Sequence, residues 1–111
     1  MKKEIIVKLH SEFEQRAHTE DNMEYWFARD LQVLLGYEQW KNFLKVIEKG
    51  KTACVNSKQL IDDHFADAGK MIDLGKGAQR NIDDIKLTRY ACYLIAQNGD
   101  PRKTEIAFAP S

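Results

Sequence analysis

Cysteine, proline and long apolar runs are scarce in this chain of 111 residues. Its two cysteines, Cys54 and Cys92, are far apart in the sequence, so we expect two buried thiols and no disulfide framework. No apolar run approaches the ~20 residues that a membrane-spanning helix needs. The apolar stretch at residues 5–7 is too short for a signal peptide. The sequence therefore predicts a cytoplasmic protein without a membrane partner.

A net charge is also absent, because 17 Lys and Arg residues balance 17 Asp and Glu residues. A neutral total argues against nucleic-acid binding, since domains that bind nucleic acids are usually basic. The charges are nevertheless segregated along the chain. Residues 21–40 are mainly acidic, whereas residues 41–60 carry five lysines against Glu48 alone. This segregation predicts a basic face on a neutral molecule.

Metal-binding and catalytic patterns are missing as well. The histidines, His10, His18 and His64, have no metal spacing with either cysteine. The pairs Asp62-Asp63 and Asp83-Asp84 could hold Mg²⁺ for nuclease chemistry. Neighbouring residues in a strand point to opposite faces, however, so neither pair converges easily on one ion. No serine lies in a nucleophile elbow. We therefore expect no metal, no cofactor and no enzyme activity.

Apolar residues make up 43% of the chain and charged residues 31%, which suits one globular domain over residues 1–111. Apolar residues at three- and four-residue steps predict helices over residues 3–18, 28–35, 39–49 and 88–97. Gly36 is expected to end the second helix, Gly50 to break the third, and Thr88 to cap the fourth. The Asp-Pro pair at residues 100–101 predicts the start of another helix, whose pattern is incomplete at the last residue. We therefore expect a fragment of a longer protein.

Strand signals are fewer. Residues 23–27 are short, aromatic and bounded by polar residues, so they predict a strand or an extended segment. Residues 65–74 and 82–87 flank a glycine-rich turn at residues 75–80, which predicts a β-hairpin. The helices at 28–35 and 39–49 have the lengths of a helix-turn-helix. The expected fold class is α+β: mostly helical, with a helix-turn-helix-like pair and one small antiparallel β-hairpin or sheet.

Several stretches of the chain carry a family resemblance. They are EYWFARDLQVLLGY at residues 24–37, WKNF at 40–43, DHFAD at 63–67 and IKLTRYACYLIAQNGDP at 85–101. From about residue 20 onward, the chain resembles the N-terminal region of the bacterial DNA-damage-inducible protein D family. That family is distantly similar to the N-terminal domain of phage antirepressors and of the baculovirus repeated open reading frame proteins.

The resemblance implies a non-catalytic regulatory module of the bacterial DNA-damage (SOS) response. The wider family is associated with DNA binding, and the closer family with restraint of the RecA recombinase. The expected partners are therefore DNA and a DNA-bound RecA-type recombinase filament. The alternative is an antirepressor-like protein-interaction domain without DNA affinity, which the neutral net charge favours. The resemblance also implies a C-terminal region that this chain lacks.

The candidate DNA contacts are three lysines on the predicted helix at residues 39–49. Four-residue spacing places Lys41, Lys45 and Lys49 on one stripe, opposite the apolar face of the helix. Lysines suit phosphates as point charges and supply affinity without reading the sequence. The alternative is an ordinary solvated face, with Lys45 paired to Glu48 or Glu38.

The predicted hairpin offers a second contact through Lys76 and Arg80, which could reach a phosphate backbone as a wing does. An ordinary solvated hairpin tip is the alternative. Aromatic residues near the predicted helix pair could also stack on the bases of single-stranded DNA, although core packing is the favoured interpretation. These aromatic residues are Tyr25, Trp26, Phe27, Tyr37 and Trp40.

Overall fold

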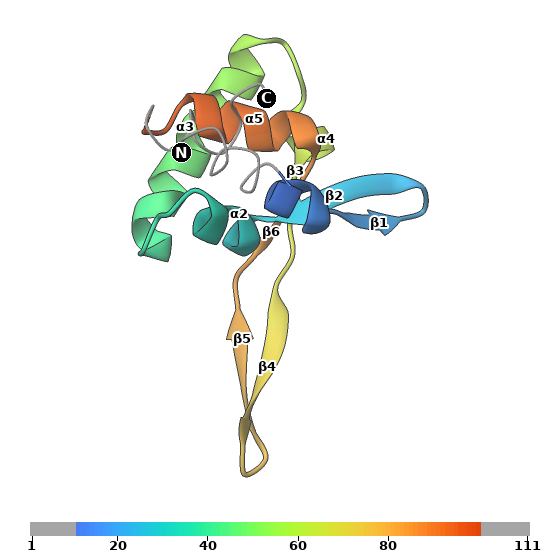
Figure 1. The fold of residues 1–111 in the computed structure, drawn as a ribbon, viewed down its shortest axis with the longest axis vertical. Helices are drawn as coiled ribbons and strands as arrows, with labels where there is room; N and C mark the ends of the chain where they lie inside the picture. The colour runs from blue at the N-terminus through green and yellow to red at the C-terminus, as the bar shows by residue number, and fades with distance from the viewer. Residues whose placement is uncertain (1–10, 101–111) are drawn as a thin grey trace.

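The computed structural model describes residues 11–100, which form an α+β domain (Figure 1). Residues 11–15 are helical. The elements that follow, in chain order, are β1 (His18–Glu20), β2 (Met23–Phe27), α2 (Ala28–Leu34), α3 (Trp40–Asn56), α4 (Ile61–His64), β3 (Phe65–Asp67), β4 (Lys70–Gly75), β5 (Ala78–Ile82), β6 (Ile85–Leu87) and α5 (Arg89–Gln97).

The strands form two antiparallel sheets, so the expectation of a mostly helical fold with one small hairpin or sheet is wrong. The larger sheet has the order β1-β2-β6-β3, and the smaller one pairs β4 with β5. Of the described residues, 47% are helical and 28% lie in strands. Three of the strands, β1, β3 and β6, have only 3 residues each. That length is too short for the alternation of apolar and polar residues to show in a sequence.

The β1–β2 pair corrects the first predicted helix. The predicted strand at residues 23–27 is confirmed as β2, but His18 begins β1 and pairs with Tyr25. The helix predicted over residues 3–18 therefore ends earlier, and its residues 3–10 lie outside the described residues. Asp21 and Asn22 connect the two strands with φ angles of 52° and 65°. Positive φ at both positions is the type I′ geometry that suits a two-residue hairpin turn.

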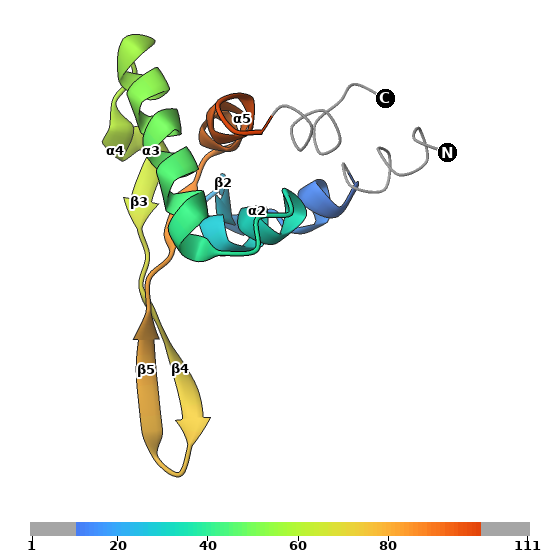
Figure 2. The same cartoon turned by 90° about the vertical axis from the view of Figure 1, so that its left-hand side faces the viewer.

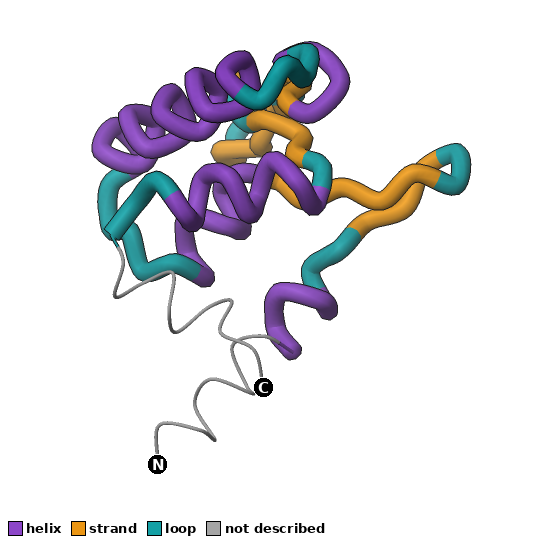
Figure 3. The backbone as a smooth tube through the Cα atoms, turned by 90° about the horizontal axis from the view of Figure 1, so that it is seen from above, coloured by secondary structure: helices purple, strands orange, loops and turns teal. Residues whose placement is uncertain are grey.

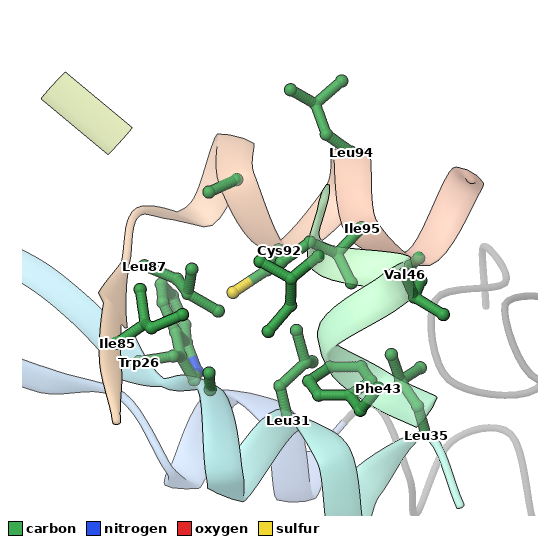
Figure 4. Close-up of a cluster of buried hydrophobic side chains, with 14 of the residues drawn as sticks. Trp26, Leu31, Leu35, Phe43, Val46, Ile85, Leu87, Cys92, Leu94 and Ile95 are labelled. Carbon is green, nitrogen blue, oxygen red and sulfur yellow. The ribbon is translucent and has the colours of Figure 1, made fainter. Parts of the chain in front are cut away.

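The core lies between the larger sheet and its helices. The helices α2 and α5 pack against β2 and β6, and α3 packs against α5 and α2. Figure 4 shows Leu31 of α2, Phe43 of α3 and Cys92 of α5 converging on Trp26 and Leu87 of the sheet. All five side chains are fully buried. Each large apolar side chain buried in this way contributes about 1.5–3 kcal/mol.

The helix α3 runs without interruption, so the break predicted at Gly50 is wrong. Gly50 is buried where α3 approaches α5, and the two helices lie side by side in Figure 2. A Cβ atom at Gly50 would lie 2.9 Å from Cγ1 of Ile95 and 3.3 Å from its Cα. Glycine therefore permits a close approach of two helices here, instead of ending one of them.

Two of the predicted helix ends are confirmed. Gly36 follows α2 with a φ of 77°, a conformation that glycine adopts readily. The Thr88 hydroxyl accepts a hydrogen bond from the Ala91 N–H at 3.1 Å and caps α5. The start of α2 has no cap from its own neighbour Phe27. A carboxylate from a distant segment takes that role, as described below.

The predicted β-hairpin is present, but the turn expected over residues 75–80 is too long, because Gly75 ends β4 and residues 78–80 belong to β5. The first predicted arm divides into β3 and β4, and the second contains β6. Strands β4 and β5 form a ribbon that projects from the body of the domain (Figures 1 and 2). Strands β3 and β6, which flank this ribbon in the sequence, join the larger sheet. Lys76 and Gly77 form the turn with φ angles of 52° and 77°. Nearly all residues of the ribbon are exposed, and only Ile72 and Ile82 are half-buried.

The helix predicted to start at residues 100–101 lies almost entirely outside the described residues. Within residues 11–100, no helix has the length and the apolar character that would be needed to cross a membrane.

Candidate nucleic-acid interface

The predicted lysines lie where the sequence placed them. Lys41, Lys45 and Lys49, called the lysine row below, are all exposed on α3. They lie opposite the buried face that contains Phe43 and Ile47. Seen from above, α3 runs along one edge of the domain (Figure 3), and the face that carries the lysine row is exposed to solvent. The helix buries one face and presents the other, as predicted.

The lysine row has no ion-pair partner among the described residues. Among the described residues, Lys45 pairs with neither Glu48 nor Glu38, and Glu48 instead lies 3.5 Å from Lys51. Other acidic residues within residues 11–100 are also paired with cations outside the row. These ion pairs are Arg16–Asp30, Lys70–Asp84, Lys86–Glu20, Arg89–Glu14 and Arg89–Glu24. Internal pairing thus neutralises cations elsewhere and leaves the row available to an anionic partner.

Arg89 is the clearest example of a cation held by the protein itself. Its guanidinium group donates to Glu14 at 2.6 Å and to Glu24 at 2.9 Å. These hydrogen bonds raise the pKa of Arg89 far above its ordinary value. The group also lies over the rings of Trp26 and Phe13. Arg89 therefore joins the first described helix, β2 and α5, and is not a candidate contact.

The hairpin residues are placed differently from each other. Lys76 is exposed in the turn, at the tip of the ribbon, as predicted. Arg80 lies within β5, opposite Ile72, and is also exposed. It lines an open hollow at the base of the ribbon together with Trp40, the first residue of α3. Arg80 thus lies between the lysine row and Lys76.

Arg29 is a candidate contact that sequence reasoning missed. Its guanidinium carbon lies 4.2 Å from the centre of the Trp40 ring, and its Nε donates to the Asp83 carbonyl at 2.7 Å. In the sequence, Arg29 is the lone cation of an acidic stretch and is 54 residues from Asp83. No local pattern in the sequence reveals such a contact, because a cation and the aromatic ring that it covers need only be close in the folded chain.

The aromatic residues are mainly structural, as favoured. Trp26 is fully buried, and Tyr25 and Phe27 pack with His18. Trp40 is half-buried and is the aromatic residue that lines the hollow beside Arg80. It is therefore the aromatic residue best placed to meet a ligand.

The paired carboxylates do not form a common site. Asp84 is buried and accepts hydrogen bonds from the Arg29 N–H at 3.1 Å and from the Ile85 N–H at 2.8 Å. Its other oxygen lies 3.1 Å from the Lys70 ammonium. Asp83 is exposed. Among residues 11–100, no group of three or more His, Cys, Asp or Glu side chains is arranged to hold a metal ion.

Comparisons with known proteins identify the family. The model of the BRO family, N-terminal domain, matches residues 14–109. DNA damage-inducible protein D of Escherichia coli (strain K12) is 46% identical over 99 residues, which cover 88% of this chain and 36% of that relative. No solved structure matches the chain. The resemblance inferred from the sequence is thereby confirmed. The chain belongs to the BRO family and carries the N-terminal domain of that family.

Proposed function

We propose that this domain is a non-catalytic regulatory module of the bacterial DNA-damage response, and that it binds DNA. The observation that carries the proposal is the lysine row. It presents three ammonium groups along ~12 Å of helix, with no carboxylate partner among the described residues. Arg80 and Lys76 extend this cationic surface onto the projecting ribbon. A neutral protein can thus offer a cationic surface to a phosphate backbone.

The name of the 46% identical relative, DNA damage-inducible protein D, supports the link to DNA damage. The chain spans about a third of that relative's length, 36%, so the activity of the whole relative is a separate matter. As a finer part of the proposal, the DNA is that of a RecA-type recombinase filament. This partner rests on the family resemblance alone.

The affinity for DNA should depend steeply on the salt concentration. Each phosphate contact releases counterions and contributes about −0.9 to the slope of log affinity against log salt concentration. Five contacts, from the lysine row with Lys76 and Arg80, predict a slope of about −4 to −5 on duplex DNA. Between ~50 mM and ~200 mM salt, the affinity should fall by about 500-fold.

The test replaces the lysine row by glutamine in one variant, K41Q/K45Q/K49Q. The slope should shrink to about −2, and the thermal midpoint should stay nearly constant, because surface substitutions shift stability by less than ~0.5 kcal/mol. Lys86→Gln is the matched control, since Lys86 of β6 is already paired with Glu20 of β1. Equal slopes for the triple variant and the parent would reduce the row to a solvated face. Absence of salt-dependent binding in the parent would instead support a protein-interaction domain without DNA affinity.

A further inference from the structure

Two open hollows meet where the first turn of α3 faces the base of the ribbon. The first has a volume of about 340 Å³ and is lined by Arg29, Trp40, Arg80, Asn81, Ile82 and Asp83. The second has a volume of about 380 Å³ and shares Trp40 and Asp83 with the first. Volumes of this size are typical of small-molecule sites and are large enough for one nucleotide.

The first hollow contains an arginine that is fixed in place. The Arg29 backbone N–H donates to Asp84, its Nε donates to the Asp83 carbonyl, and its guanidinium carbon lies over the Trp40 ring. Within the described part of the chain, its two terminal amino groups have no hydrogen-bond acceptor. A guanidinium held by its Nε and its stacking, with both amino groups free, is pre-organised for a phosphate.

Trp40 gives the same hollow an apolar wall. Arg29 covers part of the indole, and the remaining exposed surface lines both hollows. Ile82 is half-buried and lines the first hollow with it. A flat base can stack on such a wall, and base stacking on an aromatic side chain tolerates any base.

Charge separates the two hollows. Arg29 and Arg80 outnumber Asp83 in the first hollow, whereas acidic residues predominate over Lys51 in the second. A phosphate therefore fits the first hollow and is repelled from the second. Asp83, at the boundary, offers an acceptor to the hydrogen-bond donors on the edge of a base.

We propose that the first hollow is a subsite for one unpaired nucleotide of a DNA strand, which rests on the proposed DNA binding. The phosphate binds Arg29 and Arg80, and the base stacks on Trp40. A base within a duplex is stacked on both faces and paired along one edge, so it cannot enter the hollow. The domain should accordingly hold single-stranded DNA by contacts that duplex DNA lacks.

The test compares two labelled strands of ~12 nucleotides, a length within the range of single-strand binding sites. One is oligothymidylate, and the other has the same phosphates with abasic sugars. Trp40→Ala should weaken binding of the first strand by about tenfold and leave binding of the second unchanged. Arg29→Gln should weaken binding of both strands. Tyr25→Ala, which removes a half-buried ring on β2, is the matched control and should change neither.

A second readout does not depend on the folding of Trp40→Ala. Trp26 is fully buried, so quenching of the parent's tryptophan fluorescence reports on Trp40. Oligothymidylate should quench this signal, the abasic strand should not, and Trp40→Phe should abolish the difference. The subsite would be overturned if both strands quenched the fluorescence equally, or if Trp40→Ala lost the same affinity for oligothymidylate and for the abasic strand. If K41Q/K45Q/K49Q loses affinity for DNA while the two strands bind the parent equally, DNA binding stands and only the subsite fails. If neither strand nor duplex binds the parent, both proposals fail.

Discussion

At the scale of single residues, Asp84 connects the ribbon to the helices. It is a buried carboxylate, with one oxygen on the first turn of α2 and the other on Lys70, the first residue of β4. The Lys70 ammonium also lies 4.3 Å from the centre of the Phe27 ring. Because Phe27 gives α2 no side-chain cap, Asp84 supplies the missing acceptor from 55 residues away.

Replacing Asp84 by alanine should therefore lower the free energy of unfolding by about 2–3 kcal/mol. The variant leaves the Arg29 and Ile85 N–H groups without their acceptor and removes the partner of Lys70. Urea unfolding measures the loss. Asp83→Ala is the control, because Asp83 is exposed and uses its backbone carbonyl to hold Arg29, so it should change stability by less than ~0.5 kcal/mol. Similar losses in both variants would contradict the role given to Asp84.

The buried thiol of Cys92 makes stability depend on alkaline pH. Burial raises the pKa of this thiol, so the native state keeps its proton where the unfolded chain, with a pKa near ~8.5, releases it. The stabilisation that comes from keeping this thiol protonated is fully present below pH ~8.5 and is lost as the pH rises above that value. Between pH ~7.5 and ~9.5, the parent should lose about 1.4 kcal/mol more than Cys92→Ala in urea unfolding. Identical pH profiles for the parent and Cys92→Ala would show that the thiol loses its proton at the same pH in the native and unfolded states.

At the scale of elements, the contact of α3 with α5 depends on the small size of Gly50. Gly50→Ala should lower the free energy of unfolding by about 1–3 kcal/mol, although alanine is the better helix former. The added Cβ would meet the backbone of Ile95 as well as its side chain, so α5 would have to move. Thermal unfolding measures the effect. Thr52→Ala, at an exposed position of the same helix, is the control and should not destabilise. A stabilised Gly50→Ala would show that the helices can separate without loss.

The same elements show what the sequence could predict. The strand at residues 23–27, the cap at Thr88 and the glycine after α2 follow local rules, and all were found. Gly50 could not be interpreted correctly, because a glycine that ends a helix and one that permits a helix contact look alike locally. The contacts of Arg29 and Asp84 also escaped, since they join segments 54 and 55 residues apart. The exposure of the lysine row was predictable from spacing, whereas the hollow beside it exists only in the folded chain.

At the scale of the whole molecule, the ribbon projects from the body of the domain and carries two of the proposed DNA contacts, Lys76 and Arg80. Beyond Lys70, which pairs with Asp84, its residues are almost all exposed, so the core does not depend on residues 72–80. Replacing residues 72–80 by Asn-Gly would close the ribbon at the Met71–Asn81 pair with a two-residue turn. This variant should unfold within ~0.5 kcal/mol of the parent and lose about 2 units of salt slope.

The double variant K76Q/R80Q is the matched control for this shortening. It should lose the same amount of salt slope at full ribbon length, because only the charges contact phosphates. A shortened protein that is strongly destabilised would show that the ribbon supports the fold. A shortened protein that binds DNA as the parent does would place the contact elsewhere.

The most direct test of the DNA-binding surface is a map of it by NMR. The 12.9 kDa chain is small enough for amide shifts to be followed residue by residue during a titration with single-stranded DNA. We expect amide shifts on the exposed face of α3 and in the ribbon, and a shift of the Trp40 indole N–H, with β1 and α4 unaffected. Shifts confined to β1 and α4, or no shifts at any DNA concentration, would contradict the proposed surface.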